Sequence, residues 1–112
     1  MEKTVVIGGK EVRMRTSARI PFDYRNMFGK DIIREMDALE KGELDDFGMF
    51  DRLAWLFARN AGENVHAELP PQEAVGAWLE GFEGCMAILD AAPEVIELYR
   101  GAESGTSTAR KK

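Results

Sequence analysis

Few side chains in this sequence are of the kinds that do chemistry, and His66 and Cys85 have the widest range of uses. His66 stands between Glu63 and Glu68, where it could serve as a general base or a metal ligand. A structural zinc site takes about four Cys or His ligands, whereas this sequence has one of each. We therefore expect His66 to be a solvent-exposed loop residue and Cys85 to be a small buried apolar residue.

A glycine pair and two acidic groups are the other candidates for a catalytic or cofactor site. Gly8-Gly9 follows a strand-like run, but no phosphate-loop pattern surrounds it, which favours a tight turn. The acidic residues fit no calcium-binding loop, and helix capping and a solvated helix face explain them better: Asp45, Asp46, Asp37, Glu40 and Glu43. Because no set of nucleophile, base and orienting residue is present, we expect an interaction protein without catalytic activity, cofactor or metal.

The densest basic group of the chain is interleaved with two aromatic residues, Phe22 and Tyr24. Its members are Arg13, Arg15, Arg19 and Arg25. A small helical regulator that binds DNA or RNA could use such a group, and this is the alternative function. Nucleic-acid binding depends on Lys and Arg that neutralise phosphates, whereas this chain has a net charge of −5. A solvent-facing edge or a contact to an acidic neighbour is the favoured interpretation, and we do not expect a nucleic-acid partner.

The elements that position these residues fit into one domain, because 112 residues of ordinary globular composition are enough for a single core. We assign the domain to residues 1–100, with a hairpin over 3–15 and a helical body over 20–100. Residues 101–112 have nothing to bury and a net charge of +2, so we expect a flexible tail and a body with a charge of −7. No apolar run reaches the roughly 20 residues of a membrane span, and no secretory signal precedes the first strand, so we expect a cytosolic protein.

The first fifteen residues predict a β-hairpin. Alternating apolar residues flank Gly8-Gly9, a pair that supplies the positive φ angles of a two-residue turn. This turn fixes the register, in which three pairs face each other: Ile7 with Lys10, Val5 with Val12, and Lys3 with Met14. The apolar members Val5, Ile7, Val12 and Met14 then share one face, whereas Glu11, Arg13 and Arg15 point to the other.

The remaining sequence predicts four to five helices, so the fold class is α+β, mainly α: a hairpin followed by a compact helical bundle. The first helix begins at Pro21 and is stopped by Gly29, and the aromatic-rich third helix is capped by Asp45 or Asp46. The other helices are expected over residues 30–41, 72–82 and 86–100, with Pro93 either kinking the last one or starting a new one.

The aromatic residues are numerous for a domain of this size. Most of them, Phe28 included, are expected in the core, and part of the set is expected on the surface as anchors for a binding partner. The candidate protein-contact residues are Tyr24, Arg25, Arg13, Arg15, Trp78 and Phe82.

The segment Ser17 to Asp31 adds a family resemblance to this physical interpretation. Its pattern P-x-x-Y-R-x-x-F-G-x-D, preceded by Ser17-Ala18, resembles that of the tail assembly chaperones of long-tailed phages of Gram-positive hosts. The resemblance extends over about residues 3–100 through three further elements in the same order: the hairpin sequence V-x-I-x-G-K-E-V, the helix around Asp51–Trp55, and Trp78-Leu79 followed by a closing helix with Leu98-Tyr99. One departure is Ile20, where a small polar helix cap is expected, and Ser17 could cap from further back.

The resemblance implies a specific function. Such chaperones bind the long, largely helical tape measure protein in the host cytoplasm, keep it soluble, help to recruit tail tube subunits and are absent from the finished virion. Many are made in two lengths by a programmed ribosomal frameshift. For this chain the resemblance implies a tape measure protein and a tail tube protein as partners, self-association, and a location in the bacterial cytoplasm.

Overall fold

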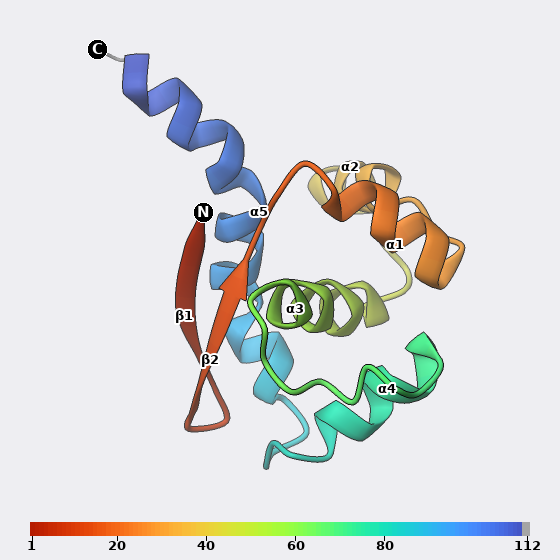
Figure 1. The fold of residues 1–112 in the computed structure, drawn as a ribbon. Coiled ribbons are helices and arrows are strands. Elements are labelled where there is room, and N and C mark those ends of the chain that lie inside the picture. The colour runs from red at the N-terminus through yellow and green to blue at the C-terminus, as the bar shows by residue number, and fades with distance from the viewer. Residues whose placement is uncertain (111–112) are drawn as a thin grey trace.

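The computed structural model describes the backbone of residues 1–110 and the side chains of residues 1–101. Within this range the chain forms an N-terminal hairpin followed by five helices, which confirms the predicted α+β, mainly α fold (Figure 1). The hairpin consists of β1 (Glu2–Ile7) and β2 (Lys10–Arg15). Its register confirms all three predicted pairs, and Gly8 and Gly9 have φ angles of 56° and 84°.

One face of the hairpin belongs to the core. Val5, Ile7 and Met14 are fully buried and Val12 nearly so, whereas the residues expected on the other face are exposed. β1 packs against α5 (Ala87–Arg110) and β2 against α3 (Gly48–Asn60). A two-stranded hairpin is marginal by itself in water, so these two helices stabilise it.

The first two helices begin and end at residues that the sequence marks. α1 (Ile20–Phe28) ends at Gly29, whose φ of 67° is the left-handed conformation that glycine adopts without steric cost. α2 (Ile32–Glu40) begins at Asp31, whose side chain accepts a hydrogen bond from the N–H of Ile33. The side chain of Ser17 accepts a hydrogen bond from the N–H of Arg19, just before α1.

Helix α3 is the centre of the molecule. It contacts α1, α4 (Pro71–Leu79), α5 and β2, and every residue from Arg52 to Ala58 is buried (Figure 1). The indole N–H of Trp55 donates to the carbonyl of Val65, which ties the loop after α3 to the core. The predicted capping residue Asp46 accepts a hydrogen bond from the N–H of Gly48 at the start of the helix.

Two predicted boundaries differ from the structure at the C-terminal side. α4 ends at Leu79 rather than Phe82, because residues 80–86 form a turn that leads into α5. Pro93 lies inside α5, and the helix continues to Arg110, past the predicted end of the helical body at residue 100. The predicted flexible tail, residues 101–112, otherwise lies outside the residues whose side chains are described, and its flexibility stays a prediction.

Candidate functional site

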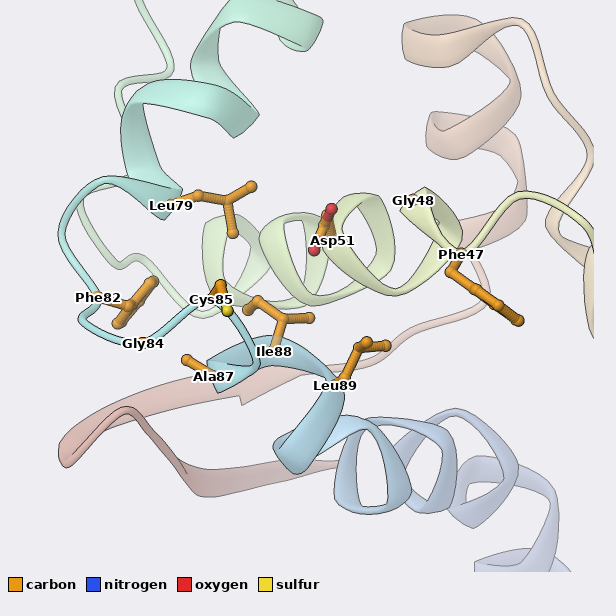
Figure 2. A pocket seen from close by; sticks show the side chains of 10 residues that line it. All are labelled: Phe47, Gly48, Asp51, Leu79, Phe82, Gly84, Cys85, Ala87, Ile88 and Leu89. Carbon is orange, nitrogen blue, oxygen red and sulfur yellow. The ribbon is translucent and has the colours of Figure 1, made fainter.

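An open groove of about 450 Å³ lies where three segments meet: the start of α3, the end of α4 and the start of α5. Figure 2 shows Asp51 on α3 between Leu79 of α4 and Phe47, with Ile88 and Leu89 on α5 nearby. The groove is lined by Phe47, Gly48, Asp51, Leu79, Phe82, Gly84, Cys85, Ala87, Ile88 and Leu89. Most of these side chains are apolar, but polar atoms of the lining, those of Asp51 among them, also reach the groove, so its surface is mixed rather than wholly apolar.

The turn between α4 and α5 forms one wall of the groove. Gly84 has a φ of 90°, a conformation that favours glycine, and it reverses the chain before α5 begins. The turn rests on the hairpin, because a Cβ on Gly8 would lie only 3.1 Å from the carbonyl oxygen of Glu83. The hairpin therefore supports the segment that carries Phe82 and Cys85.

Apolar side chains at the rim of the groove are left uncovered by the rest of the chain. Phe47 is 58% exposed, and Leu89 is 38% exposed, whereas Ile88 beside it is 7% exposed and belongs to the core. Met86, next to the lining residue Cys85, is 50% exposed. Clustered exposed apolar residues of this kind mark interaction sites, whereas single scattered ones are ordinary.

Asp51 is the one carboxylate among the ten lining residues, and none of the ten is basic. Burial raises the pKa of Asp51 above its usual value of 3.8, against the lowering influence of Arg52. Within the described part of the chain, the carboxylate of Asp51 has no hydrogen bond and no ion pair. The groove thus combines mostly apolar side chains with one partly desolvated carboxylate that no described residue pairs with.

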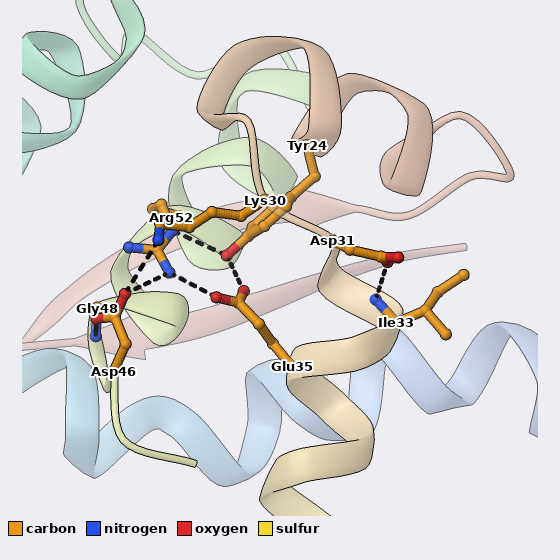
Figure 3. Close-up of polar contacts among 8 residues, drawn as sticks. All are labelled: Tyr24, Lys30, Asp31, Ile33, Glu35, Asp46, Gly48 and Arg52. Atoms are coloured by element: carbon orange, nitrogen blue, oxygen red, sulfur yellow. Dashed lines mark hydrogen bonds and ion pairs between the residues drawn. The ribbon is translucent and has the colours of Figure 1, made fainter.

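A second feature of the same end of α3 is a polar network around the buried Arg52 (Figure 3). The Arg52 guanidinium donates to the hydroxyl of Tyr24 at 2.8 Å, to Glu35 at 3.1 Å and to Asp46 at 3.2 Å. The Tyr24 hydroxyl in turn donates to the other oxygen of Glu35. Burial and this bond to Glu35 raise the pKa of Tyr24, so the hydroxyl keeps its proton at neutral pH.

The network corrects the prediction that Tyr24 is a contact residue. Its side chain is completely buried, because its hydroxyl finds partners on α2 and α3 and its ring packs edge-to-face on Phe28. Arg25, the next residue, is exposed as expected for a contact residue. Phe28 is half-buried and packs on Trp55, in line with the expected core position.

The other candidate contact residues divide between surface and core. Trp78 is only 6% exposed, because it packs edge-to-face on Phe82 at a centroid distance of 4.9 Å, so its prediction as a contact residue is also corrected. Phe82 is half-buried and lines the groove. Arg13 and Arg15 are exposed on the outer face of the hairpin, and Arg13 forms an ion pair with Glu63.

The two residues with the most versatile chemistry, Cys85 and His66, lie in a turn and a loop without a partner set for catalysis among the described residues. Cys85 is exposed, which contradicts the predicted buried position, because it lies in the turn before α5 rather than on the inner face of a helix. His66 is half-exposed in the loop after α3, 3.9 Å from Glu68. Among the described residues, no group of three His, Cys, Asp or Glu could hold a metal ion.

Sequence reasoning missed the main parts of the groove. The sequence patterns single out neither Phe47 nor Leu89, and Asp51 appears in them only as part of the family resemblance. A usable signal was the position of Phe47 just before the first turn of α3, where a side chain can point away from the helix's buried face. Ile88 and Leu89 are a second signal, because two neighbouring apolar residues on a helix point in different directions and one of them is expected to face outward.

Comparisons with known proteins show no relative of this chain. The chain matches no model of a known family, and searches of curated proteins and of solved structures found no significant similarity. In the described residues, no helix is both long and apolar enough to cross a membrane.

Proposed function

We propose that this protein is a phage tail assembly chaperone that binds helical segments of the tape measure protein through the groove beside α3. The observation that carries the proposal is the uncovered apolar rim, above all Phe47 and Leu89. A helix laid in an apolar groove is a common mode of peptide recognition, and the tape measure protein of the family is largely helical. The order of motifs from the hairpin to Leu98-Tyr99 adds the family resemblance as support.

The exposed apolar area at the rim of the groove is small, which suits a partner that must be bound and later released. At about 25 cal/mol per Å² of apolar area, covering the exposed parts of these side chains would contribute about 2–3 kcal/mol for Phe47 and about 1–1.5 kcal/mol for Leu89. One such contact is weak, but many copies along a long helix hold it cooperatively and still leave when the tail tube encloses it. Self-association and recruitment of the tail tube protein belong to the same proposal, as does absence from the finished virion.

Co-expression with the tape measure protein of the same genome tests the proposal. The tagged protein should raise the soluble fraction of the tape measure protein and co-purify with it. Phe47→Ser should abolish this, whereas Phe22→Ser is a matched control, because Phe22 is 50% exposed on α1, outside the groove. Serine is also a favoured residue at the cap position of Phe47, so the fold should be preserved.

Two results would contradict the proposal. If the tape measure protein is neither solubilised nor co-purified, the proposed chaperone function is wrong. If Phe47→Ser binds as well as wild type and Phe22→Ser loses binding, the contact surface is on α1 and not at the groove. Salt-dependent binding of the purified protein to DNA or RNA would instead favour the alternative, a nucleic-acid-binding regulator.

A further inference from the structure

Asp51 places a carboxylate among the mostly apolar side chains of the groove, and no residue in the described part of the chain pairs with it. Arg52, its neighbour, is held by Tyr24, Glu35 and Asp46, and none of its hydrogen bonds reaches Asp51. Within the described residues the Asp51 carboxylate has no hydrogen bond or ion pair. Partly burying a carboxylate without a partner is unfavourable, which the raised pKa of Asp51 reflects.

A purely local role at the start of α3 explains this arrangement poorly. Asp51 lies in the first turn, where the helix dipole favours a negative charge. The capping task, however, is done by Asp46, which accepts the N–H of Gly48. A carboxylate that only interacts with the helix dipole is most stable when it is fully hydrated. Asp51 instead lines the groove together with Leu79 and Phe47.

We propose that Asp51 makes the groove selective for a helix that carries a lysine or arginine among its apolar contact residues. This inference rests on the proposed function, since it specifies which tape measure segments the groove accepts. A Lys or Arg side chain fits such a place, because its aliphatic stem packs on apolar walls while its charged end reaches the carboxylate. The ligand's cation then supplies the partner that the described part of the chain does not.

The charge of the molecule supports this choice of ligand. The chain carries a net charge of −5, and the groove lining contains no basic residue that would repel a cation. An acidic ligand would instead place two negative charges together in a partly desolvated site, which is strongly disfavoured. A wholly apolar helix would leave Asp51 buried and unpaired.

Binding of overlapping 20-residue peptides that cover the tape measure protein tests the inference. Fluorescence anisotropy would give the affinity of each peptide, and the tightest binders should share a Lys or Arg within an apolar face. Replacing that residue by Met should weaken binding about tenfold, as for loss of a charge-assisted hydrogen bond at a partly exposed site. Asp51→Asn should weaken the original peptide by a similar factor and leave the Met peptide unchanged or tighter.

Asp45→Asn is the matched control, because it removes the same charge from an exposed residue just before α3 and outside the groove. It should change the affinity less than twofold. If Asp51→Asn and Asp45→Asn act alike, or if the tight binders carry no basic residue, the inference is wrong while the proposed function stands. If no peptide binds and the whole tape measure protein does not co-purify, both the function and the inference fall.

Discussion

Arg52 offers the sharpest test of how this fold is held together. Replacement by Met keeps the aliphatic volume and removes three hydrogen bonds, to Tyr24, Glu35 and Asp46. Asp46 loses little electrostatic stabilisation in this variant, because its side chain is 45% exposed to water and the ammonium group of Lys30 lies 3.7 Å away. Glu35 loses most, because its side chain is only 16% exposed and would keep the Tyr24 hydroxyl as its sole partner in the network.

From these contacts we expect Arg52→Met to lower the free energy of unfolding by about 3 kcal/mol, the lower end of the range for breaking a buried ion pair. Tyr24→Phe removes one hydroxyl and should cost about 1–2 kcal/mol. Urea unfolding at pH 7, followed by tryptophan fluorescence, measures both values. Arg59→Met is the matched control, because Arg59 is an exposed arginine on the same helix, and it should cost less than about 1 kcal/mol.

The double variant Glu35→Met/Arg52→Met separates lost attraction from an uncompensated charge. If the cost of Arg52→Met comes from leaving Glu35 charged and unpaired, removing Glu35 as well should recover most of the 3 kcal/mol or so. A loss below about 1 kcal/mol for Arg52→Met, equal to that for Arg59→Met, would refute the reasoning. Such a result would mean that the network in Figure 3 contributes no more than a surface contact.

Three further predictions concern the hairpin turn and two carboxylates. Gly9→Ala should lower the free energy of unfolding by about 1 kcal/mol, because Gly9 has a positive φ. Gly8→Ala should lower it more, because its Cβ would also press on the Glu83 carbonyl oxygen. Thermal unfolding measures both changes, and equal values would contradict the contact with Glu83. The N–H of the first residue of α3, and then Arg52, hold the pKa of Asp46 below its usual 3.8. Asp46 therefore stabilises the fold above that value, and the stability advantage of wild type over Asp46→Asn should fall as the pH drops below 3.8. Burial raises the pKa of Asp51 above 3.8, so in a carbon-detected NMR titration Asp51 should titrate above that value. A pKa at 3.8 would show that burial has no net effect on Asp51, and a lower pKa would show that the attraction of Arg52 outweighs burial.

The sequence is a good predictor where the cause of a structure is local. The Gly8-Gly9 pair and the alternation of apolar residues determine the hairpin register, because a one-residue shift would turn the apolar face to solvent. Gly29 and Asp31 bound their helices through contacts within a few residues. These features need no knowledge of the tertiary structure.

Prediction fails where distant segments meet. Tyr24 looks like a surface anchor in the sequence, but its hydroxyl is bound by residues 11 and 28 positions away. The amphipathic character of tyrosine allows either position, and only the packing of α2 and α3 decides between them. The groove is similar, since its walls come from three segments that are far apart in the sequence.

Gly48 connects the interior network to the groove, and its substitution tests whether the two are coupled. A Cβ at this position would lie 2.9 Å from a carboxylate oxygen of Asp46 and 3.0 Å from the Arg52 guanidinium, so one of them must move. Asp46 and Gly48 flank Phe47, and their bonds hold the backbone that presents this side chain at the groove rim.

Gly48→Ala should therefore lower the free energy of unfolding by about 1 kcal/mol, as for loss of a helix cap, although alanine is the better helix former. It should also weaken binding of the tape measure protein, because Phe47 loses its fixed position. Gly76→Ala is the control, since Gly76 lies inside α4 with open space around it, and the change should stabilise the protein slightly. Loss of binding in Gly48→Ala with retained binding in Gly76→Ala would show that the buried network positions the contact surface. Unchanged binding in both variants would show that the groove rim needs no such support.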